Sequence, residues 1–284
     1  MRIHQTVSDL RTTSRAAKLA GLRVGLVPTM GALHDGHLSL VRTAKTQCDV
    51  VVVSIFVNPL QFGPNEDLAR YPRPFARDCD LLEREGIDFL FAPSTQEMYP
   101  ADAVTYVTVE GLSDRLCGRS RPGHFRGVTT VVAKLFAIVE PDLAFFGQKD
   151  AAQAAIIRRM VHDLNFAVEI IVCPIVREPD GLAMSSRNAY LDPQQHDAAL
   201  VLYRSLIAVK AAFDQGERRA APLVEIGRQI LAQVPLVRPD YLEIVDPDTL
   251  DPLPEINRIA LAAVAGFVGG TRLIDNLLLS LQPV

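Results

Sequence analysis

The chain has 284 residues, of which 49% are hydrophobic and 22% are charged, and its formal net charge is −4. A chain of this length can bury a substantial core in one or two domains, and its slight acidity provides no global basic field, so we expect no nucleic-acid partner. Residues 1–5 lack the apolar run of a signal peptide. No segment reaches about 18 uninterrupted apolar residues, so we expect no membrane span.

The four cysteines are widely spaced and form no Cys-x-x-Cys metal signature: Cys48, Cys79, Cys117 and Cys173. We expect each to be a reduced, small core residue, which is typical of a cytoplasmic protein.

The first part of the chain alternates short apolar runs with helical patterns. A short strand is expected over 2–4, followed by an amphipathic helix, and the apolar run 24–27 has the length of a buried strand. Pro28 cannot donate a backbone hydrogen bond, so we expect it to stop that strand. A helix then begins near Leu38 and runs at least to Ala44.

The alternation continues as far as residue 173. Residues 49–57 are nearly all apolar and β-branched, as in a parallel strand that is buried on both faces. Further strands are expected over 87–91, 103–110, 143–146 and 168–173, and helices over 75–85, 128–139 and 151–163. This order predicts an α/β fold with a Rossmann-like, doubly wound parallel sheet.

The remainder of the chain has its helices first and its strands afterwards. Helices are expected over 193–213 and 222–233, and strands over 240–246, 257–265 and 271–280. This order predicts a smaller α+β C-terminal domain. We place the boundary within 178–186, which gives domains 1–178 and 179–284.

The turn over 30–37 is the first of four polar clusters expected at strand ends. It carries His34 and His37, which are three residues apart and share one face if they are helical. A helix N-terminus attracts anions through its free amides and its dipole, and two imidazole donors there suggest a phosphate site. The turn can equally be a loop with two solvated histidines, and zinc is the weaker reading because no third ligand cluster accompanies the pair.

The other three clusters are weak signals when each is taken alone. Gln61 follows Asn58-Pro59 and can be a solvated loop residue or a hydrogen-bonding partner of a substrate. Residues 147–150 with Gln153 can form a surface ion pair or a phosphate clamp with a magnesium or ribose contact. Residues 184–187 can be a helix N-cap, or they can hold phosphate oxygens with short and forked donors.

In their order and spacing, these clusters resemble the pantoate–β-alanine ligase family of the nucleotidylyltransferase superfamily. The resemblance lies in blocks of sequence that extend over about residues 1–250: 28–37, 54–63, 121–127, 145–150, 177–188 and 241–246. One departure is the apolar, glycine-rich stretch 265–270, just before the family's Thr-Arg-Leu-Ile-Asp-Asn segment at 271–276.

The resemblance implies an AMP-forming ligase that acts in pantothenate biosynthesis. Such an enzyme uses ATP and Mg²⁺ to join (R)-pantoate to β-alanine through a pantoyl adenylate, and it releases AMP and diphosphate. The family also implies a cytoplasmic homodimer with small-molecule partners, namely ATP, (R)-pantoate and β-alanine.

The resemblance also implies roles for individual residues. Gln61 and Gln153 would bind the substrates, and the catalytic set would be His34, His37, Lys149 and Arg187. The ATP-binding set would be Met30, Gly31, Ala32, Leu33, His34, Asp35, Gly36, His37, Gly147, Gln148, Lys149, Asp150, Val176, Met184, Ser185, Ser186 and Arg187. The family assigns His37 as a proton donor, whereas the chemistry favours hydrogen-bond donation, because an ionised carboxylate needs no proton removed. No metal ligands are assigned, and the loop 115–126, which contains His124, has no role readable from the sequence.

Two other functions also fit the histidine turn. A nucleotidylyltransferase would pass AMP to a phosphorylated acceptor, but that activity needs an additional basic pocket, whereas the neutral Gln61 and Gln153 favour a small hydroxy acid. A non-catalytic nucleotide-binding module would need no second substrate.

Overall fold

The structure is a computed structural model that describes residues 1–64 and 66–281. Its larger part is built on a six-stranded sheet in which every paired strand is parallel. In spatial order, the strands are β1 (Arg2–His4), β4 (Phe89–Phe91), β3 (Val50–Ile55), β2 (Val24–Thr29), β5 (Leu143–Gly147) and β6 (Glu169–Cys173).

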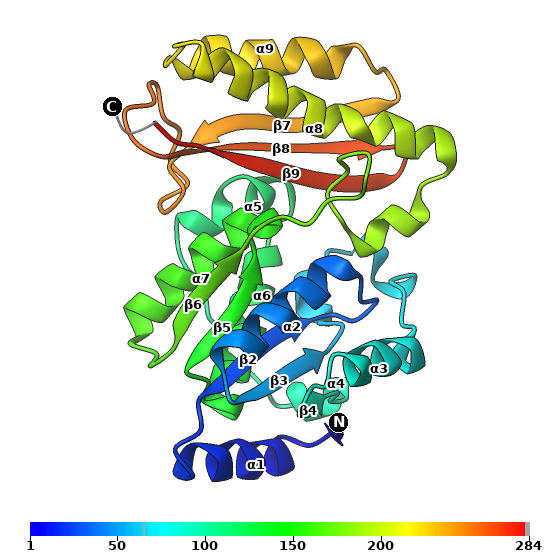
Figure 1. Ribbon diagram of the computed structural model, residues 1–284, viewed down its shortest axis with the longest axis vertical. Coiled ribbons are helices and arrows are strands. Elements are labelled where there is room, and N and C mark those ends of the chain that lie inside the picture. Colours follow the sequence, from blue (N-terminus) through cyan, green and yellow to red (C-terminus); the bar gives the residue numbers. More distant parts are fainter. Residues whose placement is uncertain (65, 282–284) are drawn as a thin grey trace.

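Helices cover both faces of this sheet (Figure 1). One face packs on α2 (Asp35–Gln47) and α3 (Phe75–Arg84), and the other on α1 (Val7–Leu19), α6 (His124–Val139) and α7 (Ala151–Leu164). The shorter helical segments of this part are α4 (Thr95–Met98), α5 (Cys117–Ser120), η1 (Pro59–Gln61), η2 (Asp67–Ala69), η3 (Leu112–Asp114) and η4 (Gln148–Asp150). The expected doubly wound α/β sheet is thereby confirmed.

The order of the strands creates a crevice beside β2. The chain passes from β2 outward to β3 and β4, and then returns to the other side of β2 to form β5 and β6. In sheets of this kind, ligands bind beyond the carboxyl ends of the strands where this reversal occurs. Here that position lies between the turn after β2 and the turn after β5.

The C-terminal part is a three-stranded antiparallel sheet covered by two helices. The strands β7 (Val237–Val245), β8 (Ala260–Val268) and β9 (Thr271–Leu279) lie in sequence order, and α8 (Pro193–Asp214) and α9 (Ala220–Ala232) cover the outer face (Figure 1). A five-residue helical segment, η5 (Ser186–Tyr190), connects the two parts. The expected α+β architecture is confirmed.

The apolar stretch 265–270 has a structural explanation in this sheet. Its first residues end β8, the central strand, which is buried on both faces. Gly266 lies against Val237 and Leu202, and Gly269-Gly270 forms the turn into β9. Gly269 has φ +57°, a value that favours glycine.

Three local expectations were wrong. Pro28 does not stop β2, which runs to Thr29. In the ladder between β2 and β5, the paired residues of β2 are Gly25 and Leu26. Beyond Leu26, the described residues pair β2 with β3 alone, so no ladder bond is lost at Pro28.

The second error concerns the start of a helix: α6 begins at His124 instead of residue 128.

The third concerns residues 103–110, where we expected a strand. The segment 103–109 contains no assigned strand. The main chain at Val107 is bonded instead to the hydroxyl groups of Thr129 and Thr130 on α6. These bonds replace the pairing that a neighbouring strand would provide.

Within the described residues, no helix is both long enough and apolar enough to cross a membrane.

Candidate active site

A pocket of about 220 Å³ lies where the strand order reverses. Many of the residues predicted to bind ATP or substrate line it: Met30, His34, Gly36, His37, Gln61, Gly147, Lys149, Asp150, Gln153, Val176, Met184, Ser185, Ser186 and Arg187. Segments that are as far apart in sequence as 30 and 187 therefore meet in one cavity.

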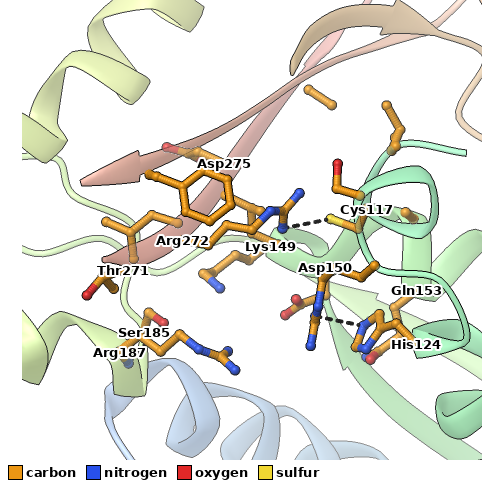
Figure 2. Close-up of a pocket in the computed structure, with 18 of the residues that line it drawn as sticks. Cys117, His124, Lys149, Asp150, Gln153, Ser185, Arg187, Thr271, Arg272 and Asp275 are labelled. Carbon is orange, nitrogen blue, oxygen red and sulfur yellow. Dashed lines mark hydrogen bonds between the residues drawn. The ribbon is translucent and has the colours of Figure 1, made fainter. Parts of the chain in front are cut away.

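A second pocket of about 300 Å³ adjoins the first and reaches the C-terminal sheet. Figure 2 shows Lys149 and Asp150 near the middle of its lining, with Arg187 on one side, His124 on the other, and Arg272 reaching in from β9. The cavity therefore continues from the Rossmann-like sheet to the C-terminal part of the protein.

The remaining residues predicted to bind ATP line neither of these two pockets: Gly31, Ala32, Leu33, Asp35 and Gln148. The amides of Ala32 and Leu33 donate to the two oxygens of Asp78, each at 2.8 Å, so they are already used within the protein. The contribution of these residues to ATP binding stays a prediction.

His34 and His37 are fixed at the start of α2. His34 is the N-cap, and its Nδ1 accepts a hydrogen bond from the amide of Gly36 at 3.1 Å. The Nδ1 of His37 accepts from the His34 amide at 3.4 Å, and the ring centroids of the two histidines are 4.1 Å apart. Because Nδ1 accepts in both rings, the proton of each neutral imidazole is on Nε2, which is left as a donor.

The surroundings keep both rings neutral. Burial, together with the charge of Lys149, lowers the pKa of His34 to about 4. Burial lowers the pKa of His37 well below its ordinary value, with further contributions from His34 and Lys149. The pair can therefore offer hydrogen bonds to phosphate oxygens at neutral pH without being charged.

Hydrogen bonds to its main chain fix the position of Lys149, whereas no carboxylate among the described residues pairs with its ammonium group. It lies in η4, directly after β5, and the side-chain amide of Asn276 in β9 donates to the carbonyls of Gln148 and Lys149 at 2.9 and 3.0 Å. Among the described residues, no carboxylate forms an ion pair with Lys149. An unpaired cation beside two neutral donors is suited to binding an anion that carries several charges.

Arg121 and Arg187, the two arginines that line the first pocket, form ion pairs with two acidic residues that are neighbours in the sequence. Arg187 donates to both oxygens of Asp67 at 2.9 Å, and Arg121 pairs with Glu66 at 2.5 Å. Burial alone would raise the pKa values of Asp67 and Glu66, but the bonds from the arginines outweigh this and hold both pKa values below their usual range. The segment around η2 therefore supplies counter-charges to these arginines.

Gln61 is buried in the wall of the pocket. Its side-chain oxygen accepts from the amide of Asn58 at 3.1 Å, and its amide nitrogen lies 3.1 Å from the sulfur of Met30. Apolar residues also line the pocket: Phe56, Val128, Val131, Val132 and Leu135. This combination suits a small molecule with both polar and apolar parts.

His124 and Arg121 belong to the site, although sequence reasoning assigned them no role. The Nδ1 of His124 donates to the carbonyl of Gln61 at 2.8 Å, and its Nε2 accepts from Arg121 at 3.1 Å. Burial and the Arg121 charge lower the pKa of His124 to about 4. The sequence did contain a signal for these two residues, the family block 121–127. Their role could not be predicted from it because it depends on contacts with Gln61, which is distant in the sequence.

The second pocket also contains Cys117, Tyr241 and Arg272. The Cys117 sulfur lies 3.2 Å from the Tyr241 hydroxyl and 3.4 Å from the Arg272 guanidinium, a contact drawn in Figure 2. All four cysteines are free thiols, as expected, but only Cys117 and Cys173 are buried, whereas Cys48 and Cys79 are half-buried.

One group of side chains among the described residues has the spacing to hold a metal ion: Glu178, Asp180 and His196. It lines neither of the two pockets, and His196 already bonds to Asp180 at 2.7 Å. Asp150, in contrast, does line both pockets.

The doubly wound sheet, the histidine-capped helix and the unpaired lysine define an enzyme of the Rossmann-like, nucleotide-binding class. Residues 2–278 match the family model described as Pantoate-beta-alanine ligase. The chain belongs to the pantoate-beta-alanine ligase family.

Curated and solved relatives agree with this assignment. The pantothenate synthetase of Koribacter versatilis (strain Ellin345) is 60% identical over 279 residues, which cover 98% of this chain and 96% of the relative. The crystal structure of pantothenate synthetase from Thermus thermophilus is 50% identical with a TM-score of 0.92, covering 98% of this chain and 99% of the other. A pantoate-beta-alanine ligase from Francisella tularensis, complexed with beta-gamma ATP and beta-alanine, is 33% identical with a TM-score of 0.80, covering 98% and 97%.

Proposed function

We propose that the protein condenses (R)-pantoate with β-alanine in an ATP-dependent reaction, forming pantothenate, AMP and diphosphate through a pantoyl adenylate. One observation carries the proposal: a single pocket is lined both by groups suited to binding phosphate, namely His34, His37 and Lys149, and by Gln61 together with apolar side chains. The solved ligase from Francisella tularensis, which was complexed with beta-gamma ATP and beta-alanine, supports it.

In the first step, the pantoate carboxylate attacks the α-phosphorus of ATP. A carboxylate oxygen–phosphorus bond forms, the bond to the bridging oxygen breaks, and diphosphate leaves. Negative charge grows on that oxygen, so donors that are already in place lower the barrier. Lys149 and the Nε2 protons of His34 and His37 are the donors we assign to it, with hydrogen bonding in place of full proton transfer.

In the second step, the amine of β-alanine attacks the acyl carbon of the adenylate. The carbon–nitrogen bond forms, the bond to the AMP oxygen breaks, and the amine loses a proton. A free carboxylate is a poor acyl donor, and adenylation solves this by supplying AMP as the leaving group. Gln61 and Gln153 are the substrate-binding residues that we assign to the pantoate end.

Arg187, with Ser185 and Ser186, is assigned to the phosphates. The pairing of Arg187 with Asp67 means that ATP must share this guanidinium with the carboxylate or displace it. The main chain of residues 147–150, with Val176 and Met184, is assigned to the adenosine portion.

We assign Mg²⁺ to Asp150 and the phosphate oxygens. A carboxylate oxygen is the ligand type that Mg²⁺ prefers, and within the described part of the chain no side chain donates a hydrogen bond to Asp150. When bound, the ion neutralises phosphate charge.

The test is a product analysis by liquid chromatography and mass spectrometry after incubation with ATP, pantoate and β-alanine. We expect AMP and pantothenate in equal amounts, and a rate about 100-fold lower for Lys149→Ala, because a preorganised donor to the leaving group is lost. The control, Lys210→Ala, removes an exposed lysine of α8 and should leave the rate unchanged. AMP found on a phosphorylated acceptor instead of free AMP would indicate a nucleotidylyltransferase.

We further propose that the protein is a homodimer in the cytoplasm, with domains 1–178 and 179–284. The free thiols support the compartment, and the end of β6 at Cys173 supports the boundary between the domains.

The segment 103–109 supports the dimer, because Val104 and Tyr106 are 84% and 44% exposed on a stretch of strand-forming sequence. In sedimentation experiments, a dimer that becomes a monomer in Val104→Asp is expected, and a monomeric wild-type protein would refute the proposal.

A further inference from the structure

The Ser54 hydroxyl is buried in the wall of the pocket without a hydrogen-bond partner. Ser54 lies near the carboxyl end of β3, is 1% exposed, and lines the same cavity as Gln61 and the histidine pair. Its Oγ has no partner among the described residues. Buried hydroxyl groups are normally paired, so an unpaired one that faces a pocket calls for a ligand.

The position of Ser54 makes this hydroxyl conspicuous. Side chains alternate between the faces of a strand, so Ser54 shares its face with Val50, Val52 and Phe56. All three are buried in the apolar core that includes α6. An alanine or valine would continue this apolar row without the free-energy penalty of an unpaired hydroxyl.

The neighbouring polar side chains are bonded to other groups, and within the described residues none of them bonds to the Ser54 hydroxyl. The Thr29 hydroxyl donates to the Ser54 carbonyl at 2.7 Å and accepts from the Gly31 amide at 3.1 Å. The side-chain nitrogen of Asn58 donates to Gln61 and to the Gly127 carbonyl, and its oxygen accepts from the hydroxyl of Tyr99.

The Gln61 side chain does have spare capacity. Among the described residues, its amide nitrogen has the Met30 sulfur as its one partner, and sulfur is a weak acceptor. The Ser54 hydroxyl and the Gln61 amide therefore both line the pocket with unused hydrogen-bonding capacity, and together they suit a ligand with hydroxyl groups.

We infer that the Ser54 hydroxyl binds one of the two hydroxyl groups of pantoate and so contributes to the choice of acid. This inference rests on the proposed function. The carboxylate of pantoate must reach the α-phosphorus beside Lys149, so the hydroxyl groups and the methyl groups fill the end lined by Ser54, Gln61 and α6. A serine hydroxyl both donates and accepts, which matches an alcohol.

Steady-state kinetics of Ser54→Ala test the inference. We expect the KM for pantoate to rise about tenfold, which corresponds to the loss of one hydrogen bond, while the KM for ATP stays within about twofold. Thermal unfolding should give a Tm equal to or above that of the wild type, because the variant removes an unpaired hydroxyl. A lower Tm with an unchanged KM for pantoate would overturn the inference, since the hydroxyl would then be structural.

Ser205→Ala is the matched control. Ser205 is 0% exposed in α8, and its hydroxyl donates to the Leu202 carbonyl at 2.7 Å, remote from the pocket. Its removal should leave both KM values unchanged. Ser54→Cys is the second variant, because it keeps the shape of the side chain with a slightly larger atom while weakening the donor, and it should also raise the KM for pantoate.

Two analogues of pantoate, each lacking one hydroxyl, complete the experiment. The wild type should use both analogues less efficiently than pantoate. With Ser54→Ala, the preference for pantoate should shrink for the analogue that lacks the partner hydroxyl and persist for the other. Unchanged preferences for both analogues would refute the inference, whereas a wild type that forms no AMP from pantoate would refute the proposed function itself.

Discussion

Burial and the nearby Lys149 charge lower the pKa of His34 to about 4, and the pKa of His37 is lowered well below its ordinary value, chiefly by burial. Each Nδ1 accepts an amide hydrogen bond, so each Nε2 carries the proton of a neutral ring. At the scale of single residues, the site therefore separates its tasks: the histidines supply uncharged donors and Lys149 supplies the positive charge.

The first prediction concerns pH. In a profile of kcat/KM for ATP, which reports the free enzyme, we expect no loss of activity near pH 6.5 and an acid limb nearer to about pH 4. An acid limb at about 6.5 would show that a histidine with an ordinary pKa is required.

The free energy of unfolding should also depend on pH, through His34 and His124. His34 and His124 bind protons near pH 6.5 when unfolded, but only near about pH 4 when folded. The unfolded state therefore binds more protons between these values, and the free energy of unfolding should fall as the pH drops from about 6.5 to 4. Denaturant unfolding curves across this range check the sign.

At the scale of elements, α3 holds the turn that follows β2. The carboxylate of Asp78 accepts from the amides of Ala32 and Leu33, each at 2.8 Å, and Asp78 is 1% exposed. The turn needs this support because Gly31 and Ala32 have φ values of +80° and +50°. For alanine that conformation is unfavourable.

We predict that Asp78→Ala lowers the free energy of unfolding by about 3 kcal/mol, because two buried amides lose their acceptor. Urea unfolding measures the change. Asp80→Ala, at an exposed position of the same helix, is the control and should have little effect. Equal values for both variants would mean that the turn keeps its shape without Asp78.

The elements could largely be predicted because their patterns are local. The apolar strands and amphipathic helices of both parts occur close to the expected ranges, as the run 49–57 illustrates with β3 at 50–55. The errors depended on tertiary context. Pro28 fits into β2 because its ladder with β5 has already ended, and 103–110 forms no strand because hydroxyl groups of α6 bond its main chain.

For the candidate site, the sequence grouped residues only where a motif contained them. His34 and His37, Lys149 and Arg187 line one pocket, whereas the carboxylates of Glu66 and Asp67 could not be anticipated as partners of Arg121 and Arg187. Such pairs join residues at least 55 positions apart, and a single sequence gives no local pattern for them.

At the scale of the whole molecule, the C-terminal sheet reaches into the active site. Asn276 of β9 is 2% exposed, and its side chain bonds to the carbonyls of Gln148 and Lys149 and accepts from the Gln148 side chain at 3.0 Å. Beside it, Asp275 pairs with Arg177 at 2.6 Å. The position of Lys149 therefore depends on how the two parts of the protein are joined.

We predict that Asn276→Ala lowers kcat for adenylate formation about tenfold, because a small displacement of Lys149 weakens its contact with the leaving group. Asn257→Ala, at an exposed position of the same part, should be neutral. Steady-state kinetics measure both variants. A loss of stability in Asn276→Ala with kcat unchanged would limit Asn276 to a structural role.

In the proposed reaction, ATP activates pantoate before β-alanine takes part. The most direct measurement is the exchange of labelled diphosphate into ATP by the wild-type protein without β-alanine. We expect exchange that requires pantoate and that falls about 100-fold in Lys149→Ala. Exchange that proceeds without pantoate, or its absence from folded protein supplied with pantoate and Mg²⁺, would contradict this order of steps.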